Sequence, residues 1–155
     1  MTQPAAHAWG CLAALDPGRS KCGLVRTDAA QQQLEEALIL PAEMCRRTLQ
    51  QWQQGQQLSA VVLGNGTSSQ QWQAFLEQLK LPVLLVDEWG TTLAARSRYW
   101  QLWPARGWQA LLPQGLRLPP GDLDDLAAQI LLERWLAREL PRSSGAQKRA
   151  LTVKA

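Results

Sequence analysis

The sequence has little histidine, little cysteine and no long apolar run, and each shortage removes a class of protein. Its one histidine, His7, lies near the N-terminus, so Ser-His-Asp or Cys-His catalysis would depend on that residue alone. The three cysteines, Cys11, Cys22 and Cys45, are odd in number and lack metal-type spacing, which predicts buried free thiols rather than disulfides or a zinc site. No apolar stretch reaches the roughly 18–20 residues that span a bilayer, so we expect no membrane partner.

The first residues, MTQPAAHAWG, show no basic segment followed by an apolar one, so we see no secretory signal and expect a cytoplasmic protein. With 155 residues, 46% of them hydrophobic and 19% charged, the composition predicts one globular domain. We expect an N-terminal tail over 1–7, a folded domain over 8–140 and a flexible basic tail over 141–155. The C-terminal tail has a net charge of +4, whereas the rest of the chain has a net charge of −1. Such a basic tail either contacts a polyanion or is simply solvated and keeps the protein in solution.

Apolar periodicity and turn signals predict an α/β fold. The stretch 101–121 contains four prolines and three glycines and is predicted to be a long loop. The element order predicts a mixed sheet flanked by helices. The predicted strands cover 8–15, 21–27, 34–40, 58–64 and 81–88, and the predicted helices cover 42–54, 68 or 69 to 80, 91 or 92 to 100, and 122 or 123 to 140.

Acidic residues stand where predicted strands end and where the last helix begins. Asp16 follows CLAAL, Asp87 and Glu88 follow LPVLLV, and Asp124 and Asp125 open the final helix. In an open α/β sheet such positions gather at one rim, where carboxylates without a partner would repel one another and require a cation. Oxygen ligands favour Mg²⁺ or Mn²⁺, and two such ions support phosphodiester hydrolysis without histidine. The alternative is that these acids only serve turns and the helix dipole.

Helical geometry helps to choose among the acids of the last helix. At about 100° per residue, Asp125 is expected to point nearly opposite the buried stripe, whereas Asp124 lies at the edge of that stripe. Asp122 is expected to cap the helix. This geometry favours Asp124 as the site residue. The predicted buried stripe consists of Leu123, Leu126, Ala127, Ile130 and Leu131.

Two further stretches contain residues suited to nucleic acid. The turn Gly64-Asn65-Gly66-Thr67 leads from a strand into a helix, where it would either hold a phosphate or serve as a plain glycine turn. It lacks the Gly-Lys-Ser/Thr ending of a nucleotide P-loop. The segment YWQLWPARGW, 99–108, holds three of the eight tryptophans beside arginines, and it would either stack bases or pack in a core or lid.

Taken together, these segments resemble the YqgF (also called RuvX) family of the RNase H-like superfamily, relatives of Holliday-junction resolvases. The matching pieces cover about residues 11–137 and are ALDPGRSKCGLV, VVLG, VDEWGTTLAARS and LDDLAAQILLERWL. The resemblance implies an RNase H-like fold, whose mixed sheet has three antiparallel strands followed by parallel strands. It also implies a metal-dependent nuclease that processes the 5′ end of pre-16S ribosomal RNA or cleaves branched DNA. Carried over by position, the acids would be Asp16, Glu88 and Asp124, with Asp16 bridging two Mg²⁺ or Mn²⁺ ions.

Basic and hydroxyl side chains near the acids are candidates to hold nucleic acid. The candidates lie in the turn beside Asp16, in the Gly-Asn-Gly-Thr turn and in the helix after Glu88. A homodimer, as in junction resolvases, stays open. The expected nucleic-acid contacts are Arg19, Lys21, Asn65, Thr67, Thr91 and Arg96.

The chain also departs from the family pattern at positions near the substrate. Trp89 stands where the family usually has arginine, Asn65-Gly66 replaces Leu-Pro, and Ala94 replaces a glutamate. These departures keep open a second function, a non-catalytic nucleic-acid-binding module with a degenerate site, since the Gly-Asn-Gly-Thr turn also resembles the related domain of Tex-type transcription factors. An actin/Hsp70-like ATPase fragment is disfavoured because this length cannot supply a second nucleotide-binding lobe.

Overall fold

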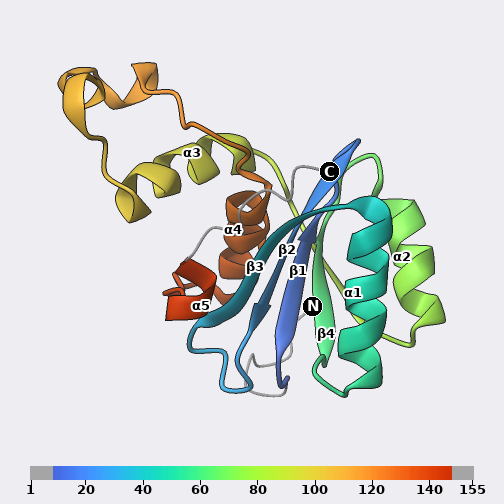
Figure 1. Ribbon diagram of the computed structural model, residues 1–155. Helices are drawn as coiled ribbons and strands as arrows, with labels where there is room; N and C mark the ends of the chain where they lie inside the picture. Colours follow the sequence, from blue (N-terminus) through green and yellow to red (C-terminus); the bar gives the residue numbers. More distant parts are fainter. Residues whose placement is uncertain (1–8, 148–155) are drawn as a thin grey trace.

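The computed structural model describes residues 9–147 and contains a five-stranded mixed sheet in the order β3-β2-β1-β4-β5 (Figure 1). β1 pairs antiparallel with β2, which pairs antiparallel with β3, whereas β4 runs parallel to β1 and to β5. The predicted α/β fold with an antiparallel-then-parallel sheet is therefore confirmed. The predicted tail over 1–7, with His7, lies outside the described residues. The strands are β1 (Leu12–Asp16), β2 (Lys21–Thr27), β3 (Leu34–Pro41), β4 (Ala60–Gly64) and β5 (Val83–Val86).

Helices cover both faces of the sheet (Figure 1). α1 (Ala42–Gln54) and α2 (Ser69–Gln78) pack on one face, where Leu49 and Trp72 meet the strand residues Leu15 and Leu63. α4 (Asp124–Leu136) packs on the other face. α3 (Thr91–Leu102) packs against α4 rather than against the sheet, and the short α5 (Ser144–Gln147) lies near β3.

Strand geometry explains why the central strands are apolar throughout. Successive side chains of a strand point to opposite faces, so Leu12 and Ala14 of β1 face α4, while Ala13 and Leu15 face α1 and α2. All four are fully buried, because both faces of this strand are covered. The same alternation decides which side chain at the end of each strand turns towards α4.

The folded region continues beyond the predicted boundary at 140. α4 ends at Leu136 because Ala137 adopts a left-handed conformation with φ 56°, several residues before the expected stop at Pro141. Arg142 is buried and pairs through its backbone with Leu34, and α5 follows. The expected flexible tail is therefore wrong for 141–147, and residues 148–155 lie outside the described part.

The proline-rich stretch 101–121 is largely irregular and extends away from the sheet (Figure 1). It contains two short 3-10 turns, η2 (Gly107–Leu111) and η3 (Gln114–Leu116). The aromatic segment 99–108 overlaps the start of this stretch. Its Tyr99 and Trp100 are buried against α4, as the packing alternative predicted, whereas Trp108 is 70% exposed.

The cysteines are free thiols, as predicted. Cys22 and Cys45 are fully buried, and Cys11 is partly buried. No helix within residues 9–147 combines the length and the apolar character needed to cross a membrane.

Candidate active site

Two of the three predicted acids leave their strands on the face that α4 covers. Asp16 lies two residues after Ala14, and Glu88 lies two residues after Val86, so both continue the α4-facing side of β1 and β5. Asp87 falls between these positions and is exposed. The two-residue period therefore selects Glu88 rather than Asp87 as the partner of Asp16.

Gly23 brings the third acid to this rim. It is the cross-strand partner of Asp16 on β2. A Cβ atom built at Gly23 would lie 1.7 Å from the backbone oxygen of Asp124, so the first turn of α4 rests directly on the strand at this point. Only glycine permits that approach, and it places the start of α4 next to Asp16.

The Gly-Asn-Gly-Thr turn holds the carboxylate of Glu88. A Cβ atom at Gly66 would lie 2.1 Å from Oε1 of Glu88, and one at Gly64 would lie 2.7 Å from its Oε2. The side-chain oxygen of Asn65 accepts a hydrogen bond from the backbone N–H of Glu88 at 3.3 Å. Asn65, predicted to contact nucleic acid, thus positions an acid, and the two glycines leave room for that acid.

The carboxylates disturb one another electrostatically. Burial raises the pKa of Asp16 to about 7, and repulsion from Asp124 and Glu88 adds to this effect. Burial also raises the pKa of Asp124, with further contributions from Asp122 and Asp125. Such repulsion is what a divalent cation would relieve, because its charge favours the ionised form of each acid.

The three acids lie at the same rim of the sheet, but their side chains do not group closely enough to coordinate one metal ion. Within residues 9–147, no group of three or more His, Cys, Asp or Glu side chains lies close enough together to hold a metal ion. The carboxylate of Glu88 instead lies against Gly66. The donor set itself, carboxylate oxygens alone, fits Mg²⁺ or Mn²⁺.

A small polar hollow adjoins Glu88. Its volume is about 50 Å³, enough for a few water molecules but not for a nucleotide. Thr67, predicted to contact nucleic acid, is exposed at this hollow. The hollow is lined by Pro17, Gly66, Thr67, Ser68, Ser69 and Glu88.

Some of the other predicted nucleic-acid contacts are accessible, whereas others already form bonds within the protein. Arg19 is exposed in the turn after β1, and Arg96 is partly buried on α3. The Lys21 side chain is 43% exposed, and its Nζ forms an ion pair with Asp122 at 2.9 Å. Thr91 is buried, and its hydroxyl donates to the backbone oxygen of Glu88 at 2.9 Å. The expected contact at Thr91 is therefore wrong, because this side chain supports the turn instead.

Two expectations for the last helix are also wrong. Asp125 does not point outward: it is 2% exposed and forms an ion pair with Arg142 at 3.1 Å. The buried-stripe argument assumed one covered face, whereas α4 is covered on several sides. Asp122 does not cap the helix, because Leu123 occupies the N-cap position without a side-chain hydrogen bond and Asp122 pairs with Lys21.

Sequence reasoning did not identify Arg134 on α4. Its guanidinium donates to the backbone oxygen of Asp87 at 2.7 Å, next to Glu88. Nothing in the local sequence links α4 to the turn after β5, so only the packed structure could find this contact.

Comparison with known proteins added no relative to these observations: no protein-family model and no curated protein matched the chain.

Proposed function

We propose that this protein is a divalent-metal-dependent nuclease with an RNase H-like fold. One observation carries the proposal: Asp16 and Glu88 leave the ends of β1 and β5 towards α4, whose first residue, Asp124, is seated on Gly23 beside Asp16. The raised pKa of Asp16 supports the same grouping. The sheet order agrees with the proposed fold without being specific to it.

In this proposal Asp16, Glu88 and Asp124 hold one or two Mg²⁺ or Mn²⁺ ions. When bound, these ions would stabilise the charge that develops on phosphate oxygens and activate a water molecule. Asp16, whose pKa is raised to about 7 by burial and by Asp124 and Glu88, would lose its proton on binding. Glu88 would have to move away from Gly66, because its carboxylate now lies in the turn. Arg19, exposed beside Asp16, would contact the phosphate backbone.

The proposed substrate is structured nucleic acid, either the 5′ end of pre-16S ribosomal RNA or branched DNA. This choice follows from the family resemblance of the motifs around the acids. The accessible residues Arg19 and Thr67, on two sides of the rim, agree with a substrate that crosses it.

The test is cleavage of ribosomal-precursor RNA and of four-way DNA junctions with Mg²⁺ by wild type, Asp16→Asn and Asp87→Asn. We expect Asp16→Asn to abolish cleavage. Asp87→Asn should cleave like wild type, because Asp87 is exposed on the other side of the chain and asparagine keeps its Oδ1 acceptor. Equal cleavage by wild type and Asp16→Asn would reject the assigned site.

A second function is favoured by the position of Glu88. Because its carboxylate lies against Gly66, and no three acids within residues 9–147 group closely enough to hold a metal ion, a non-catalytic nucleic-acid-binding module is the main alternative. Calorimetric titration with Mg²⁺ separates the two. The nuclease predicts binding that Asp16→Asn removes, whereas the module predicts no metal binding but salt-sensitive binding of nucleic acid.

A further inference from the structure

Trp89 places a solvent-exposed aromatic ring beside the rim that carries Asp16, Glu88 and Asp124, called the acidic rim below. It follows Glu88 directly, and 83% of its surface is exposed. Tryptophan is normally well buried, because exposing its ring forgoes a large hydrophobic contribution. A tryptophan left uncovered at this position therefore points to a ligand for the ring.

The turn that carries the ring is held by a set of hydrogen bonds. The Trp89 N–H donates to Oδ1 of Asp87 at 3.0 Å, and the Glu88 N–H donates to Asn65. The backbone oxygen of Glu88 accepts from both the N–H and the hydroxyl of Thr91, at 3.1 and 2.9 Å. The ring is thus presented by a fixed backbone, which lowers the ordering cost of binding.

A cation lies beside the same turn. Arg134 is exposed, donates to the backbone oxygen of Asp87, and has its Nη2 atom 3.9 Å from a Cβ built at Gly90. Within residues 9–147 no acidic side chain forms an ion pair with Arg134. Trp89 on the turn and Arg134 of α4 beside it therefore offer a π-face and a positive charge side by side.

We propose that Trp89 stacks on an unpaired base of the nucleic acid at the acidic rim, with Arg134 near a neighbouring phosphate. An aromatic ring next to a cation is the usual arrangement for binding single strands. Bases within a duplex already stack on one another, so an exposed ring can engage only a base that is unpaired or turned out. This inference rests on the proposed function and adds to it that the substrate is single-stranded beside the cleaved bond.

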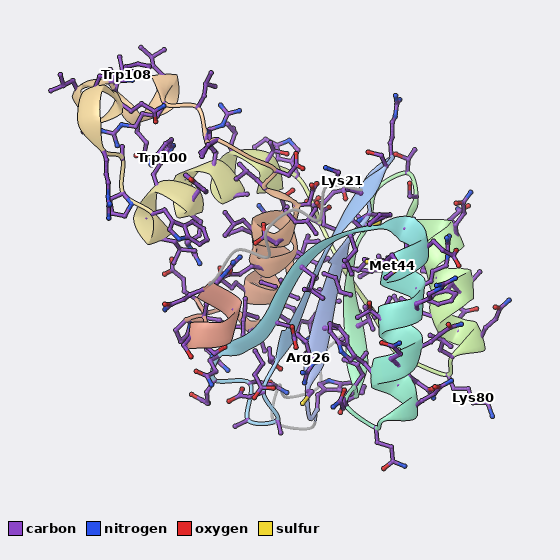
Figure 2. All side chains as sticks on the ribbon, viewed as in Figure 1. Lys21, Arg26, Met44, Lys80, Trp100 and Trp108 are labelled. Carbon is purple, nitrogen blue, oxygen red and sulfur yellow. The ribbon has the colours of Figure 1, made fainter. Side chains whose placement is uncertain are left out.

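The chain offers a matched control for this ring. Trp108 is similarly exposed, at 70%, but it lies at the far end of the projecting 101–121 stretch, away from Lys21 and the rim (Figure 2). Any general effect of removing a surface tryptophan should appear in both variants. An effect of stacking at the rim should appear only at Trp89.

The experiment measures fluorescence anisotropy of a labelled 12-nucleotide single-stranded RNA with wild type, Trp89→Ala, Trp89→Phe and Trp108→Ala, in EDTA at low salt. Loss of one base stack should raise the Kd of Trp89→Ala about tenfold. Trp89→Phe should stay within about threefold of wild type because phenylalanine also stacks. Trp108→Ala should lose clearly less affinity than Trp89→Ala, because Trp108 lies away from the rim. A blunt duplex of the same sequence should bind wild type and Trp89→Ala equally.

Several results would overturn the proposal: no binding of the single strand by wild type, an unchanged Kd for Trp89→Ala, an equal loss on the duplex, or an equal loss in Trp108→Ala. Thermal unfolding of each variant checks that it is folded, and Trp89→Phe keeps the test valid if alanine disturbs the turn. Because EDTA prevents metal-dependent cleavage, failure of the stacking proposal is measured separately from failure of the nuclease proposal, which the Mg²⁺ cleavage assay decides.

Discussion

Gly23 determines how closely α4 approaches the sheet beside Asp16. The Cβ of Gly23→Ala would meet the backbone oxygen of Asp124 at 1.7 Å, a contact that no side-chain rotation can relieve. We expect this substitution to lower the free energy of unfolding by about 2 kcal/mol or more, as overpacking does. Urea unfolding monitored by circular dichroism measures the change.

Gly115→Ala is the matched control for that substitution. Nothing lies within 4 Å of a Cβ atom at Gly115, so the free energy of unfolding should stay within about 0.5 kcal/mol of wild type. Equal stability of the two variants would show that α4 does not rest on Gly23 as described.

Asp16 should make the stability of the metal-free protein depend on pH. Its pKa rises from 3.8 in the unfolded chain to about 7 in the folded one, so its ionisation destabilises the fold as pH increases between these values. In EDTA, Asp16→Asn should therefore be more stable than wild type at pH 8, by about 1–3 kcal/mol, and about equal to it near pH 4. Urea unfolding at both pH values measures this difference.

Asp87→Asn controls for the loss of a negative charge as such. Asp87 is exposed, so its substitution should change stability by less than about 0.5 kcal/mol at either pH. Addition of Mg²⁺ should stabilise wild type and not Asp16→Asn. An advantage of Asp16→Asn that is the same at pH 4 and pH 8 would contradict the role of ionisation.

The acids also show how far single residues could be assigned from the sequence. The two-residue period of β5 distinguishes Glu88 from Asp87, because Val86 packs, partly buried, on the α4 face and fixes the face of the residue two positions later. The orientation of Asp125 could not be obtained in this way. Its partner, Arg142, lies in a segment that was expected to be flexible, and long-range contacts of this kind leave no local pattern.

The helix α4 is covered on several sides and therefore buries polar side chains. Its Gln129 and Glu133 are buried together with Asp125. Arg98 of α3 forms an ion pair with Glu133 at 2.9 Å, and Arg142 donates to Gln129 at 2.8 Å. These contacts join α3, α4 and the C-terminal segment through charged and hydrogen-bonded groups, not through apolar packing alone.

Removing one member of the Asp125–Arg142 pair should strongly destabilise this assembly. Both side chains are almost completely buried, so Arg142→Met would leave the Asp125 carboxylate buried without its cation. We expect a loss of roughly 3–5 kcal/mol in urea unfolding. The double variant Arg142→Met with Asp125→Leu should recover part of that loss, because two apolar residues often replace a buried pair without penalty.

The exposed pair of Arg47 and Glu43 on α1 is the control for the buried pair. Their side chains are 65% and 70% exposed and lie 3.8 Å apart. Arg47→Ala should change the free energy of unfolding by less than about 0.5 kcal/mol, since exposed pairs of this spacing contribute little. A similar small effect of Arg142→Met would mean that the C-terminal segment is not held by this pair.

At the scale of the whole molecule, the mixed sheet of antiparallel and parallel strands was predictable because both the short β1–β2 turn and the helical crossovers leave few topologies. The length of α4 was not, because its end depends on Ala137 in a left-handed conformation that alanine seldom adopts. The three acids were predictable only as neighbours at one rim of the sheet. That the Glu88 carboxylate lies against Gly64 and Gly66 was not, because a contact between two separate turns leaves no local pattern in the sequence.

Stability should be distributed unevenly between the sheet domain and the projecting 101–121 stretch. In the latter, Leu111, Leu116 and Leu118 are 87%, 65% and 70% exposed, so replacing all three with serine removes little buried area. We expect the triple variant to unfold in urea within about 1 kcal/mol of wild type. Leu131→Ala, at a fully buried position packed against Gly64, should instead lose about 2–5 kcal/mol. A loss in the triple variant as large as that of Leu131→Ala would mean that the projecting stretch folds back onto the sheet domain and that its leucines belong to the core.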